Sequence, residues 1–400
     1  MAQHRFTIVG GGLVGLGSAY RLQEAYPDAQ VTVLEKEPGV CRHQSGHNSG
    51  VLHCGLYYKP GSMKARMAVT GIRQMVAFCQ EHNIPHEVCG KLVVATSEEE
   101  VERLKDLQTR GTQNGLEGLQ WMERAEYREI EPYAGGIAAL RVPQEGIADY
   151  PAVADTLVRL ITARGGQVRT NAKVTALRQT AEGWVAETPA GAVESTMLVN
   201  CAGLHSDLVA MMSGQKREVR IVPFRGEYYK IRRERETLVR HLIYPVPDPK
   251  FPFLGVHYTR MIQGGVECGP NAVLAFCREG YRKTDFKAGE MWDALTFSGL
   301  WRFLGRYPRM CFDEMRRSFS KSLFCASLQR LVPEVRIEDL EEGGAGVRAQ
   351  AMNPSGDLVQ DFHFVHGPRA LHVVNAPSPG ATSSLAIGQE VTAMVVKSLG

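Results

Sequence analysis

Three glycines near the start of the chain have the spacing of a phosphate-binding turn. Gly10, Gly12 and Gly15 follow the order G-x-G-x-x-G directly after the β-branched run 6–9, and residues 16–25 can continue as a helix. One glycine permits a tight turn, one lets the backbone approach a pyrophosphate, and one lets the helix lie close to the strand. Unpaired N–H groups at the helix N-terminus then attract the phosphates. The motif predicts a dinucleotide-binding site.

An acidic residue narrows the choice of dinucleotide. Residues 31–34 form a second β-branched run, and Glu35 follows it directly. A carboxylate at the end of that strand can accept hydrogen bonds from both hydroxyls of an adenosine ribose, which favours an unphosphorylated ribose. FAD or NAD is therefore expected rather than NADP.

The segment 38–58 combines small residues with hydrogen-bonding ones. It contains three histidines and two tyrosines but little charge, whereas an ordinary polar surface loop rarely brings such residues together. Small residues allow the backbone to press against a flat cofactor, and hydroxyl and amide groups can then reach phosphates and ring edges. We therefore expect this segment to contact the cofactor.

Positioning these groups requires a buried parallel sheet. The runs 6–9 and 31–34 suit buried parallel strands, and similar runs return at 196–203 and 370–374 after a long insertion. A parallel sheet that resumes in this way predicts a discontinuous domain. We assign residues 1–84, 146–215 and 341–400 to an α/β, Rossmann-type cofactor domain, and residues 85–145 and 216–340 to a second, substrate domain.

The second domain shows a different pattern. Residues 222–231 and 254–275 are rich in strand-forming residues and are punctuated by glycine turns, which predicts an antiparallel sheet that roofs the cofactor. Residues 289–333 are expected to be helical.

The totals of the sequence limit the classes of protein that it can encode. Four hundred residues exceed what one hydrophobic core usually organises, so two domains are expected. The net charge of +3 gives no reason to expect a nucleic-acid partner. The nine cysteines form no C-x-x-C pair, which favours free thiols in a reducing compartment, and no metal site is predicted.

The beginning of the chain and its apolar runs bear on its location. The first predicted strand starts at residue 6, which leaves no room for a signal peptide. No run of 18 apolar residues is present, so no membrane-spanning segment is predicted. We expect a cytoplasmic protein that is free or attached peripherally to the cytoplasmic side of the inner membrane.

Several blocks of sequence resemble one known flavoprotein family. The blocks are HNSGVLH (47–53) with GLYY (55–58), FRGEYY (224–229), GPNAVLAF (269–276) with REGY (278–281), GVRAQ (346–350) and SPGATSSLA (378–386). They resemble the L-2-hydroxyglutarate oxidase/dehydrogenase family within the FAD-dependent D-amino-acid-oxidase superfamily. The resemblance spans nearly the whole chain, from Phe6 to Val395.

The resemblance implies FAD rather than NAD, and L-2-hydroxyglutarate, a short 2-hydroxy dicarboxylate, as the substrate. It implies a Rossmann-type FAD-binding domain with a glycine oxidase-like antiparallel substrate domain. Hydride transfer from the substrate carbon to flavin N5 would yield 2-oxoglutarate, and a quinone or oxygen would take the electrons. Two alternatives stay open: an FAD-dependent amino acid or amine oxidase of the glycine oxidase type, and a dinucleotide-binding redox sensor without catalysis.

Oxidation of an alcohol carbon needs a base for the hydroxyl proton and anchors that hold the substrate at the hydride acceptor. Arginine suits a carboxylate, since its fork binds bidentately, and Arg348 stands among glycines that leave room for a ligand. Histidine suits the base. His53 follows the flavin-contacting loop and is favoured, and His257 on a predicted roof strand is the alternative.

The predicted site residues therefore fall into three groups. The catalytic group is His53, His257 and Arg348. The further substrate-binding group is Arg225, Tyr58, Tyr258, Arg260 and Ser383, with Arg278 as another candidate arginine. The cofactor-binding group is Gly10, Gly12, Leu13, Val14, Gly15, Glu35, Lys36, Ser45, His47, Asn48, Ser49, Val174, Cys201, Ala202, Gly203, Pro379, Gly380, Ala381, Thr382, Ser383 and Ser384.

One helical segment, residues 291–330, mixes aromatic and basic residues. It contains Trp292 and Trp301, six further aromatic residues, and seven basic residues against three acidic ones. Aromatic and cationic side chains together favour an interfacial membrane contact. The alternative is a helical excursion packed on the protein itself or on a second subunit.

Overall fold

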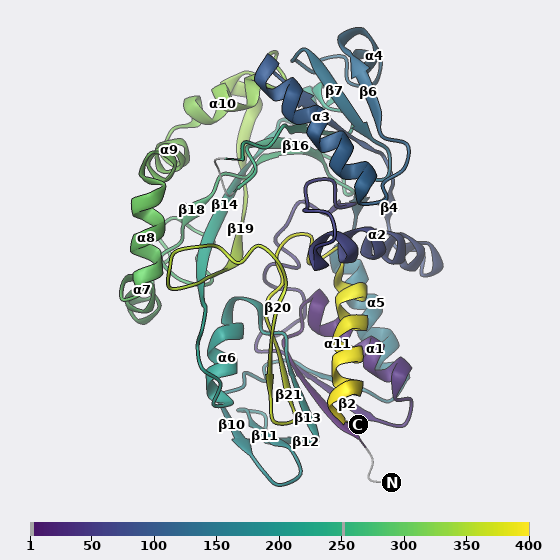
Figure 1. The fold of residues 1–400 in the computed structure, drawn as a ribbon, viewed down its shortest axis with the longest axis vertical. Helices are drawn as coiled ribbons and strands as arrows, with labels where there is room; N and C mark the ends of the chain where they lie inside the picture. The colour runs from purple at the N-terminus through teal and green to yellow at the C-terminus, as the bar shows by residue number, and fades with distance from the viewer. Residues whose placement is uncertain (1–3, 250–252, 400) are drawn as a thin grey trace.

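The computed structural model describes residues 4–249 and 253–399. A six-stranded sheet carries the glycine motif (Figure 1), and all its neighbouring pairs are parallel except β20–β21. In order across the sheet, the strands are β20 (His363–Gly367), β21 (Ala370–Asn375), β13 (Met197–Asn200), β1 (Arg5–Val9), β2 (Gln30–Leu34) and β9 (Gln167–Arg169).

Both faces of this sheet are buried, which explains the continuous apolar runs in its strands. Phe6 and Ile8 face one core with the helices α1 (Leu13–Ala25), α5 (Tyr150–Ala163) and α11 (Ser384–Leu399). Leu34 and Leu198 face another core, against a three-stranded sheet. That sheet consists of β10 (Ala176–Gln179), β11 (Trp184–Glu187) and β12 (Val193–Ser195).

A second, nine-stranded sheet forms the other half of the molecule (Figure 1). Its pairs are antiparallel except β15–β5. The strands run in the order β18 (Val273–Leu274), β14 (Arg220–Ile231), β17 (Val266–Gly269), β16 (His257–Arg260), β15 (Leu242–Pro245), β5 (Lys91–Ala95), β7 (Ala138–Val142) and β6 (Gln120–Glu123), and β19 (Leu340–Met352) also pairs with β14.

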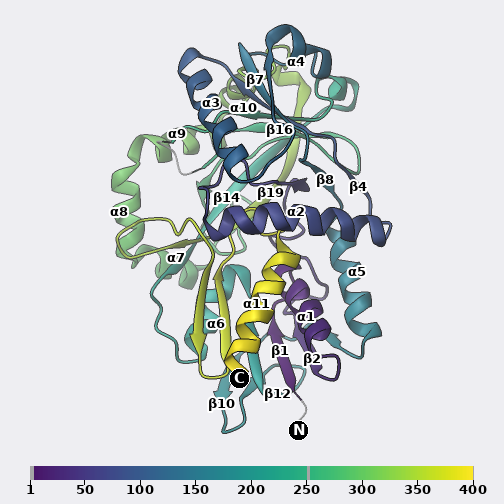
Figure 2. The same ribbon diagram turned by 45° about the vertical axis from the view of Figure 1, so that its right-hand side comes forward.

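The remaining elements surround or join the two sheets. Helix α2 lies between them in Figure 2, and helices α7 to α10 follow the outer edge as an arc in Figure 1. The helices are α2 (Met63–Glu81), α3 (Glu98–Gln113), α4 (Arg124–Ile130), α6 (Ser206–Met212), α7 (Ala288–Leu295), α8 (Ser298–Arg306), α9 (Pro308–Phe319) and α10 (Lys321–Gln329). A small sheet contains β3 (Val51–Leu52), β8 (Gly146–Ala148) and β4 (His86–Glu87), and the 3₁₀ turns are η1 (Gly203–His205), η2 (Arg233–Leu238) and η3 (Ile337–Asp339).

The predicted fold class, with a Rossmann-type sheet, an antiparallel sheet and a helical excursion, is confirmed. Strand pairing differs from the predicted boundaries at one point. Residues 341–352, assigned from the sequence to the cofactor domain, lie in β19 and pair along β14 in the nine-stranded sheet. The long β19 therefore belongs to the second sheet by its hydrogen bonds. Among the residues described, no helix is long and apolar enough to cross a membrane.

Candidate active site

A cavity of about 1010 Å³ extends from the six-stranded sheet to the nine-stranded one. Its lining includes residues that directly follow β1, β2, β13 and β21, so it opens at the carboxyl ends of these parallel strands. Ligands of open α/β sheets bind in that crevice. The far wall carries Tyr228, Tyr244, His257 and Arg348 from the second sheet. The cavity thus joins the dinucleotide motif to a set of groups that can bind and deprotonate a substrate.

The dinucleotide end has the open backbone that a pyrophosphate needs. Gly10 has a φ of +112°, and a Cβ there would collide with the carbonyl oxygen of Cys201. Gly12 is the N-cap of α1 and supplies no side chain to its N-terminal N–H groups. The Leu13 N–H donates to Ser45 Oγ at 3.0 Å, which fixes the neighbouring loop. These features fit the phosphates of a dinucleotide.

The Glu35 carboxylate is held at the mouth of this turn. Its Oε2 accepts from the Gly11 N–H at 2.7 Å, and its Oε1 accepts from the Glu37 N–H at 2.9 Å. The side chain is buried at the end of β2 and lines the cavity. Its position fits the adenosine ribose contact predicted from the sequence.

Most of the predicted cofactor-binding residues line the cavity, and three do not. Gly15 lies behind the turn, where a Cβ would collide with the Gly10 carbonyl oxygen, so it serves the close approach of helix and strand. Ser383 and Ser384 are fully buried at the start of α11, and Ser383 lies against Gly71 of α2. The residues that line the cavity are Gly10, Gly12, Leu13, Val14, Glu35, Lys36, Ser45, His47, Asn48, Ser49, Val174, Cys201, Ala202, Gly203, Pro379, Gly380, Ala381 and Thr382.

Both predicted histidines line the cavity, in different electrostatic settings. His53 Nδ1 lies 3.5 Å from Glu145 Oε2. His257 Nδ1 donates to the Gly255 carbonyl oxygen at 2.9 Å, and the His257 ring stacks on Tyr244 with centroids 3.9 Å apart. Burial lowers the pKa of His257 to about 3, although the hydrogen bond to Gly255 raises it. His257 is therefore neutral at physiological pH, whereas His53 faces a carboxylate.

Arg348 projects a cation into the cavity. Its guanidinium lies 5.5 Å from the centre of the Phe253 ring, and burial lowers its pKa although it remains a cation. Within residues 4–249 and 253–399, no ion pair of Arg348 is found, although the charge of Glu314 favours its protonated form. Tyr228 stands beside it, where burial raises the tyrosine pKa to about 12 and Arg348 lowers it. Tyr58 also lines the cavity.

The structure directs the other candidate arginines away from the cavity. Arg225 is paired in register with Val347, the chain neighbour of Arg348, so the two arginines leave opposite faces of the sheet. The Arg225 guanidinium donates to Glu227 at 2.9 Å and to the Arg282 carbonyl oxygen at 3.0 Å. Arg278 is buried in an ion pair with Asp207 at 2.6 Å.

The same alternation separates three residues of β16. His257 faces the cavity, whereas Tyr258 and Arg260 leave the opposite face of the strand. The Tyr258 hydroxyl donates to the Leu328 carbonyl oxygen at 3.0 Å, and Arg260 pairs with Glu87 at 2.6 Å. These two residues and Ser383 therefore do not line the cavity.

The sequence alone did not predict a role for three charged residues near the substrate end of the cavity, Lys64, Lys91 and Glu145. Lys91 and Glu145 form a buried ion pair with a distance of 2.7 Å. Lys64, at the start of α2, lines the cavity 4.5 Å from the centre of the Tyr58 ring, and burial lowers its pKa to about 8 against the opposing charge of Asp361. Each stands in an unremarkable polar context in the sequence, so no local pattern marks it.

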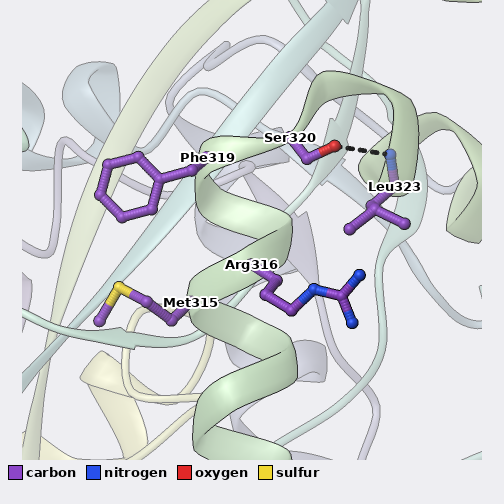
Figure 3. Close-up of a pocket in the computed structure, with 5 residues that line it drawn as sticks. All are labelled: Met315, Arg316, Phe319, Ser320 and Leu323. Carbon is purple, nitrogen blue, oxygen red and sulfur yellow. Dashed lines mark hydrogen bonds between the residues drawn. The ribbon is translucent and has the colours of Figure 1, made fainter.

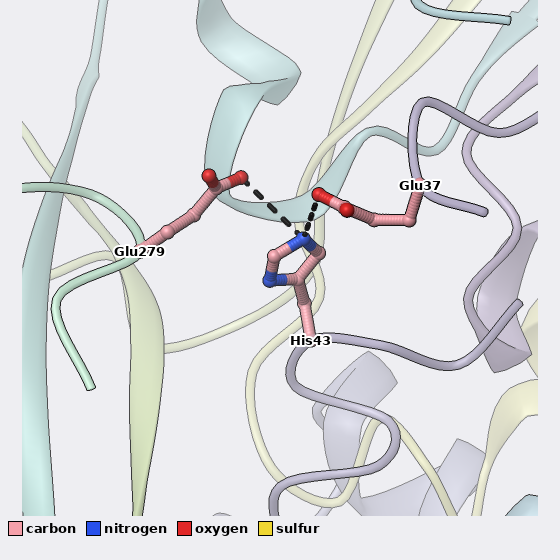
Figure 4. Close-up of side chains that lie close together, drawn as sticks. All are labelled: Glu37, His43 and Glu279. Carbon is pink, nitrogen blue, oxygen red and sulfur yellow. Dashed lines mark hydrogen bonds and ion pairs between the residues drawn. The ribbon is translucent and has the colours of Figure 1, made fainter. Parts of the chain in front are cut away.

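Another cluster, drawn in Figure 4, brings together Glu37, His43 and Glu279. Its geometry could hold a metal ion, but the Lys36 ammonium already lies among these groups, 2.6 Å from Glu279 and 2.8 Å from His43 Nε2. Tyr281 donates or accepts a 2.8 Å hydrogen bond at His43 Nδ1. The lysine supplies the positive charge, and the cluster joins the end of β2 to the segment after β18.

The whole chain matches one family of flavoproteins. The profile described as FAD dependent oxidoreductase matches residues 5–394, and the chain belongs to this family of FAD-dependent enzymes. The predicted cofactor, FAD, is confirmed in this way. Solved structures share the fold: an L-alpha-glycerophosphate oxidase from Mycoplasma pneumoniae with FAD bound has a TM-score of 0.78 at 22% identity, and covers 99% of this chain and 95% of its own. A glycine oxidase from Geobacillus kaustophilus has a TM-score of 0.73 at 20% identity, with coverage of 99% and 95%.

Closer relatives in sequence narrow the family. An L-2-hydroxyglutarate dehydrogenase of Indibacter alkaliphilus is 49% identical over 98% of both chains, and that of Escherichia coli K12 is 44% identical over 98% of this chain and 92% of its own. The mitochondrial L-2-hydroxyglutarate dehydrogenase of Homo sapiens is 43% identical over 95% of this chain and 86% of its own. The chain therefore belongs to the L-2-hydroxyglutarate dehydrogenase family, and the resemblance of the sequence blocks is confirmed.

Proposed function

We propose that this chain oxidises L-2-hydroxyglutarate to 2-oxoglutarate with FAD as its cofactor. The observation that carries the proposal is the shared cavity, in which the dinucleotide turn, His53 and Arg348 line one space. When bound, FAD supplies the hydride acceptor for the substrate carbon. The relatives at 43–49% identity are named for this substrate, which supports the same choice.

Arg348 is the proposed carboxylate anchor. A guanidinium without an acidic partner has its five N–H donors available, and a planar carboxylate accepts two of them side by side. Arg348 is half-buried, so the pair forms away from bulk water, where charge-assisted hydrogen bonds are stronger. Tyr228 and Tyr58 provide further polar contacts on the cavity wall. Such contacts orient the substrate C–H bond toward the hydride acceptor.

His53 is the proposed base for the hydroxyl proton. Its Nδ1 is directed at Glu145, which leaves Nε2 as the nitrogen that can accept a proton in the cavity. His257 donates from Nδ1 to the backbone and is held neutral by burial, so it is a hydrogen-bonding neighbour rather than the base. This division of roles between the two histidines is testable by substitution.

Anaerobic bleaching of the bound flavin tests the proposed substrate. L-2-Hydroxyglutarate should bleach the wild type fully, whereas glycine, sarcosine and glycerol 3-phosphate should not. Arg348→Lys should slow bleaching sharply at the same FAD content, since an ammonium cannot form the bidentate pair.

The outcomes separate the competing functions. Bleaching by glycine or sarcosine alone would establish the amine oxidase alternative, and no bleaching by any of the four compounds would favour a redox sensor. Normal kinetics in Arg348→Lys would place the anchor elsewhere.

A second proposal concerns the membrane and the electron acceptor. We propose that helices α7 to α10 lie on an anionic membrane surface, peripherally on the cytoplasmic side, and that the reduced flavin passes its electrons to a quinone there; oxygen is the alternative acceptor. The supporting feature is a row of exposed apolar residues along these helices and the segment before them. They are Phe286, Trp292, Leu295, Trp301, Phe312, Met315, Phe319 and Leu323.

The exposure of these side chains is unusual for a folded surface. Trp292 is 70% exposed and Phe319 is 73% exposed, and a shallow pocket of about 390 Å³ lies beside Phe319 between α9 and α10 (Figure 3). Arg302, Arg309 and Arg316 are exposed on the same helices. Each basic residue near an anionic surface adds about 1 kcal/mol of attraction. Phe297, Phe303 and Phe324, three of the six further aromatic residues in the segment 291–330, are buried and belong to the protein's own core.

Serine substitutions at the exposed aromatics test the membrane proposal. The double variant Trp301→Ser/Phe319→Ser should no longer sediment with anionic phospholipid vesicles, since both side chains are largely exposed and supply apolar contact area. Within the protein, the substitutions remove the hydrogen bond from Trp301 Nε1 to the Leu295 carbonyl oxygen and the contact of Lys283 with the Phe319 ring. The turnover of this double variant with a soluble electron acceptor should equal that of the wild type.

The matched control is Val88→Ser/Ile137→Ser, two exposed apolar residues outside these helices. It should bind vesicles like the wild type. Failure of the wild type to bind anionic vesicles, or full binding by the aromatic double variant, would contradict the proposal.

A further inference from the structure

A buried charge pair stands behind the proposed base. Lys91 begins β5, Glu145 precedes β8, and their side chains are 0% and 1% exposed. Burying two charges costs several kcal/mol per ion, so such a pair contributes little to stability compared with two apolar residues. The stability of the fold therefore does not explain why this ion pair is present.

The carboxylate of this pair faces His53 and its chain neighbour. Glu145 Oε2 lies 2.7 Å from Lys91 Nζ and 3.5 Å from His53 Nδ1. Glu145 Oε1 accepts from the Cys54 N–H and Sγ, both at 3.3 Å. The His53 N–H donates to Thr382 Oγ1 at 3.2 Å, so the backbone of His53 is also held. The Nδ1 of His53 therefore faces the Glu145 carboxylate, and Nε2 faces the cavity.

We propose that Glu145 is a positioning residue for His53 and that Lys91 is the counter-ion that keeps Glu145 ionised. The inference rests on the proposed oxidation of a 2-hydroxyacid. The carboxylate favours the tautomer with the proton on Nδ1, so Nε2 carries the lone pair. The substrate O–H bond breaks, its proton moves to Nε2, and its electron pair forms the new C=O bond as the C–H bond breaks. A bound FAD would accept the hydride from that carbon.

The two charges act on His53 in opposite directions. Burial opposes ionisation of Glu145, but Lys91 and His53 together outweigh it and hold the pKa of this carboxyl well below its usual range. The carboxylate stabilises the imidazolium that forms when His53 takes the proton. Lys91 offsets part of that attraction, because its like charge repels the imidazolium.

Apart from Lys64, the tyrosine, thiol, histidine and arginine groups around this site keep their charge state across the working pH range. Lys91 Nζ lies 4.4 Å from the centre of the Tyr57 ring and 4.9 Å from that of Tyr244. Burial raises the pKa of Tyr57, Tyr244 and Cys54, and burial keeps His257 neutral, while Arg348 stays charged. Lys64 lines the same cavity, and burial lowers its pKa to about 8, so the His53→Ala variant is needed to separate the contribution of His53 from that of Lys64.

The test compares a variant that removes the negative charge of Glu145 with one that removes the positive charge of Lys91. For each variant, the rate of anaerobic flavin reduction by L-2-hydroxyglutarate is measured in the holoenzyme as a function of pH. Activity requires unprotonated His53, so the rate is lost on acidification. Glu145→Gln should move this acid limb to lower pH by about one to three units and lower the plateau. Lys91→Met should move the limb to higher pH. The double variant Glu145→Gln/Lys91→Met should return the limb towards its wild-type position.

A second readout does not depend on turnover. NMR titration of ¹⁵N-histidine-labelled holoenzyme, with the His53 signals assigned from His53→Ala, should show midpoints that move in the same two directions. The contrary result is a loss of plateau rate in both single variants without opposite shifts of the acid limb of the pH–rate profile and of the NMR midpoint of His53. That result would show that the pair is merely structural and would overturn the inference.

Charge-conserving variants keep the inference falsifiable if the first set loses FAD. Glu145→Asp and Lys91→Arg should leave the acid limb and the His53 midpoint at their wild-type positions, and a shift in either variant would contradict the inference. If L-2-hydroxyglutarate fails to reduce even the wild type, the proposed function fails, and the NMR midpoints still decide the coupling of His53 to the pair.

Discussion

Replacing His53 by alanine is expected to slow flavin reduction by roughly 10²–10⁴-fold, which is the usual effect of removing a positioned general base. The side chain is only 20% exposed, but it lines the cavity, so the space that alanine leaves is continuous with that cavity and FAD should stay bound. Stopped-flow reduction by L-2-hydroxyglutarate at saturating substrate measures the effect. The flavin absorbance before mixing reports cofactor content in the same sample.

His257→Ala is the matched control for this result. His257 lines the same cavity and is neutral through burial, so its removal should cost far less in the reduction rate. An unchanged rate in His53→Ala together with a large loss in His257→Ala would exchange the roles of the two histidines. Equal, modest losses of the reduction rate in both variants would show that neither histidine alone accepts the proton. That result would contradict the assignment of His53 as the base.

Gly12→Val is expected to abolish FAD binding. Gly12 caps α1 at the cavity, and a Cβ there already comes within 3.1 Å of Ser45 Oγ, so the two methyl groups of valine would occupy the space of the pyrophosphate. The ratio of flavin absorbance to protein in the purified variant measures the loss. Far-ultraviolet circular dichroism checks that the apoprotein is folded.

The control for this prediction is Gly305→Val on α8. A Cβ at Gly305 meets nothing within 4 Å, and valine has a higher helix propensity than glycine, so the substitution should not destabilise α8 and should leave FAD content at the wild-type value. An unchanged flavin content in Gly12→Val would remove the glycine turn from the cofactor site. Loss of flavin in Gly305→Val would point to a general effect on folding.

Local sequence patterns determined the cofactor end of this protein. The glycine spacing from Gly10 to Gly15 and the acid at Glu35 lie within one strand–turn–helix–strand unit, so short-range geometry dictates their positions. The helical segment 289–333 and the antiparallel roof also follow from local periodicity and turn residues. The family blocks, each contiguous in sequence, identified the L-2-hydroxyglutarate dehydrogenase family.

Tertiary structure alone decided which side chains meet at the substrate end. Arg225 and Arg348 both lie in family-like blocks, yet the antiparallel register of β14 and β19 sends them to opposite faces. The same alternation separates His257 from Tyr258 and Arg260. Lys91 and Glu145 meet His53 only because β5, the turn before β8 and the loop after β3 converge there. Periodicity along one segment carries no information about such contacts, since they depend on the pairing of strands that are distant in sequence.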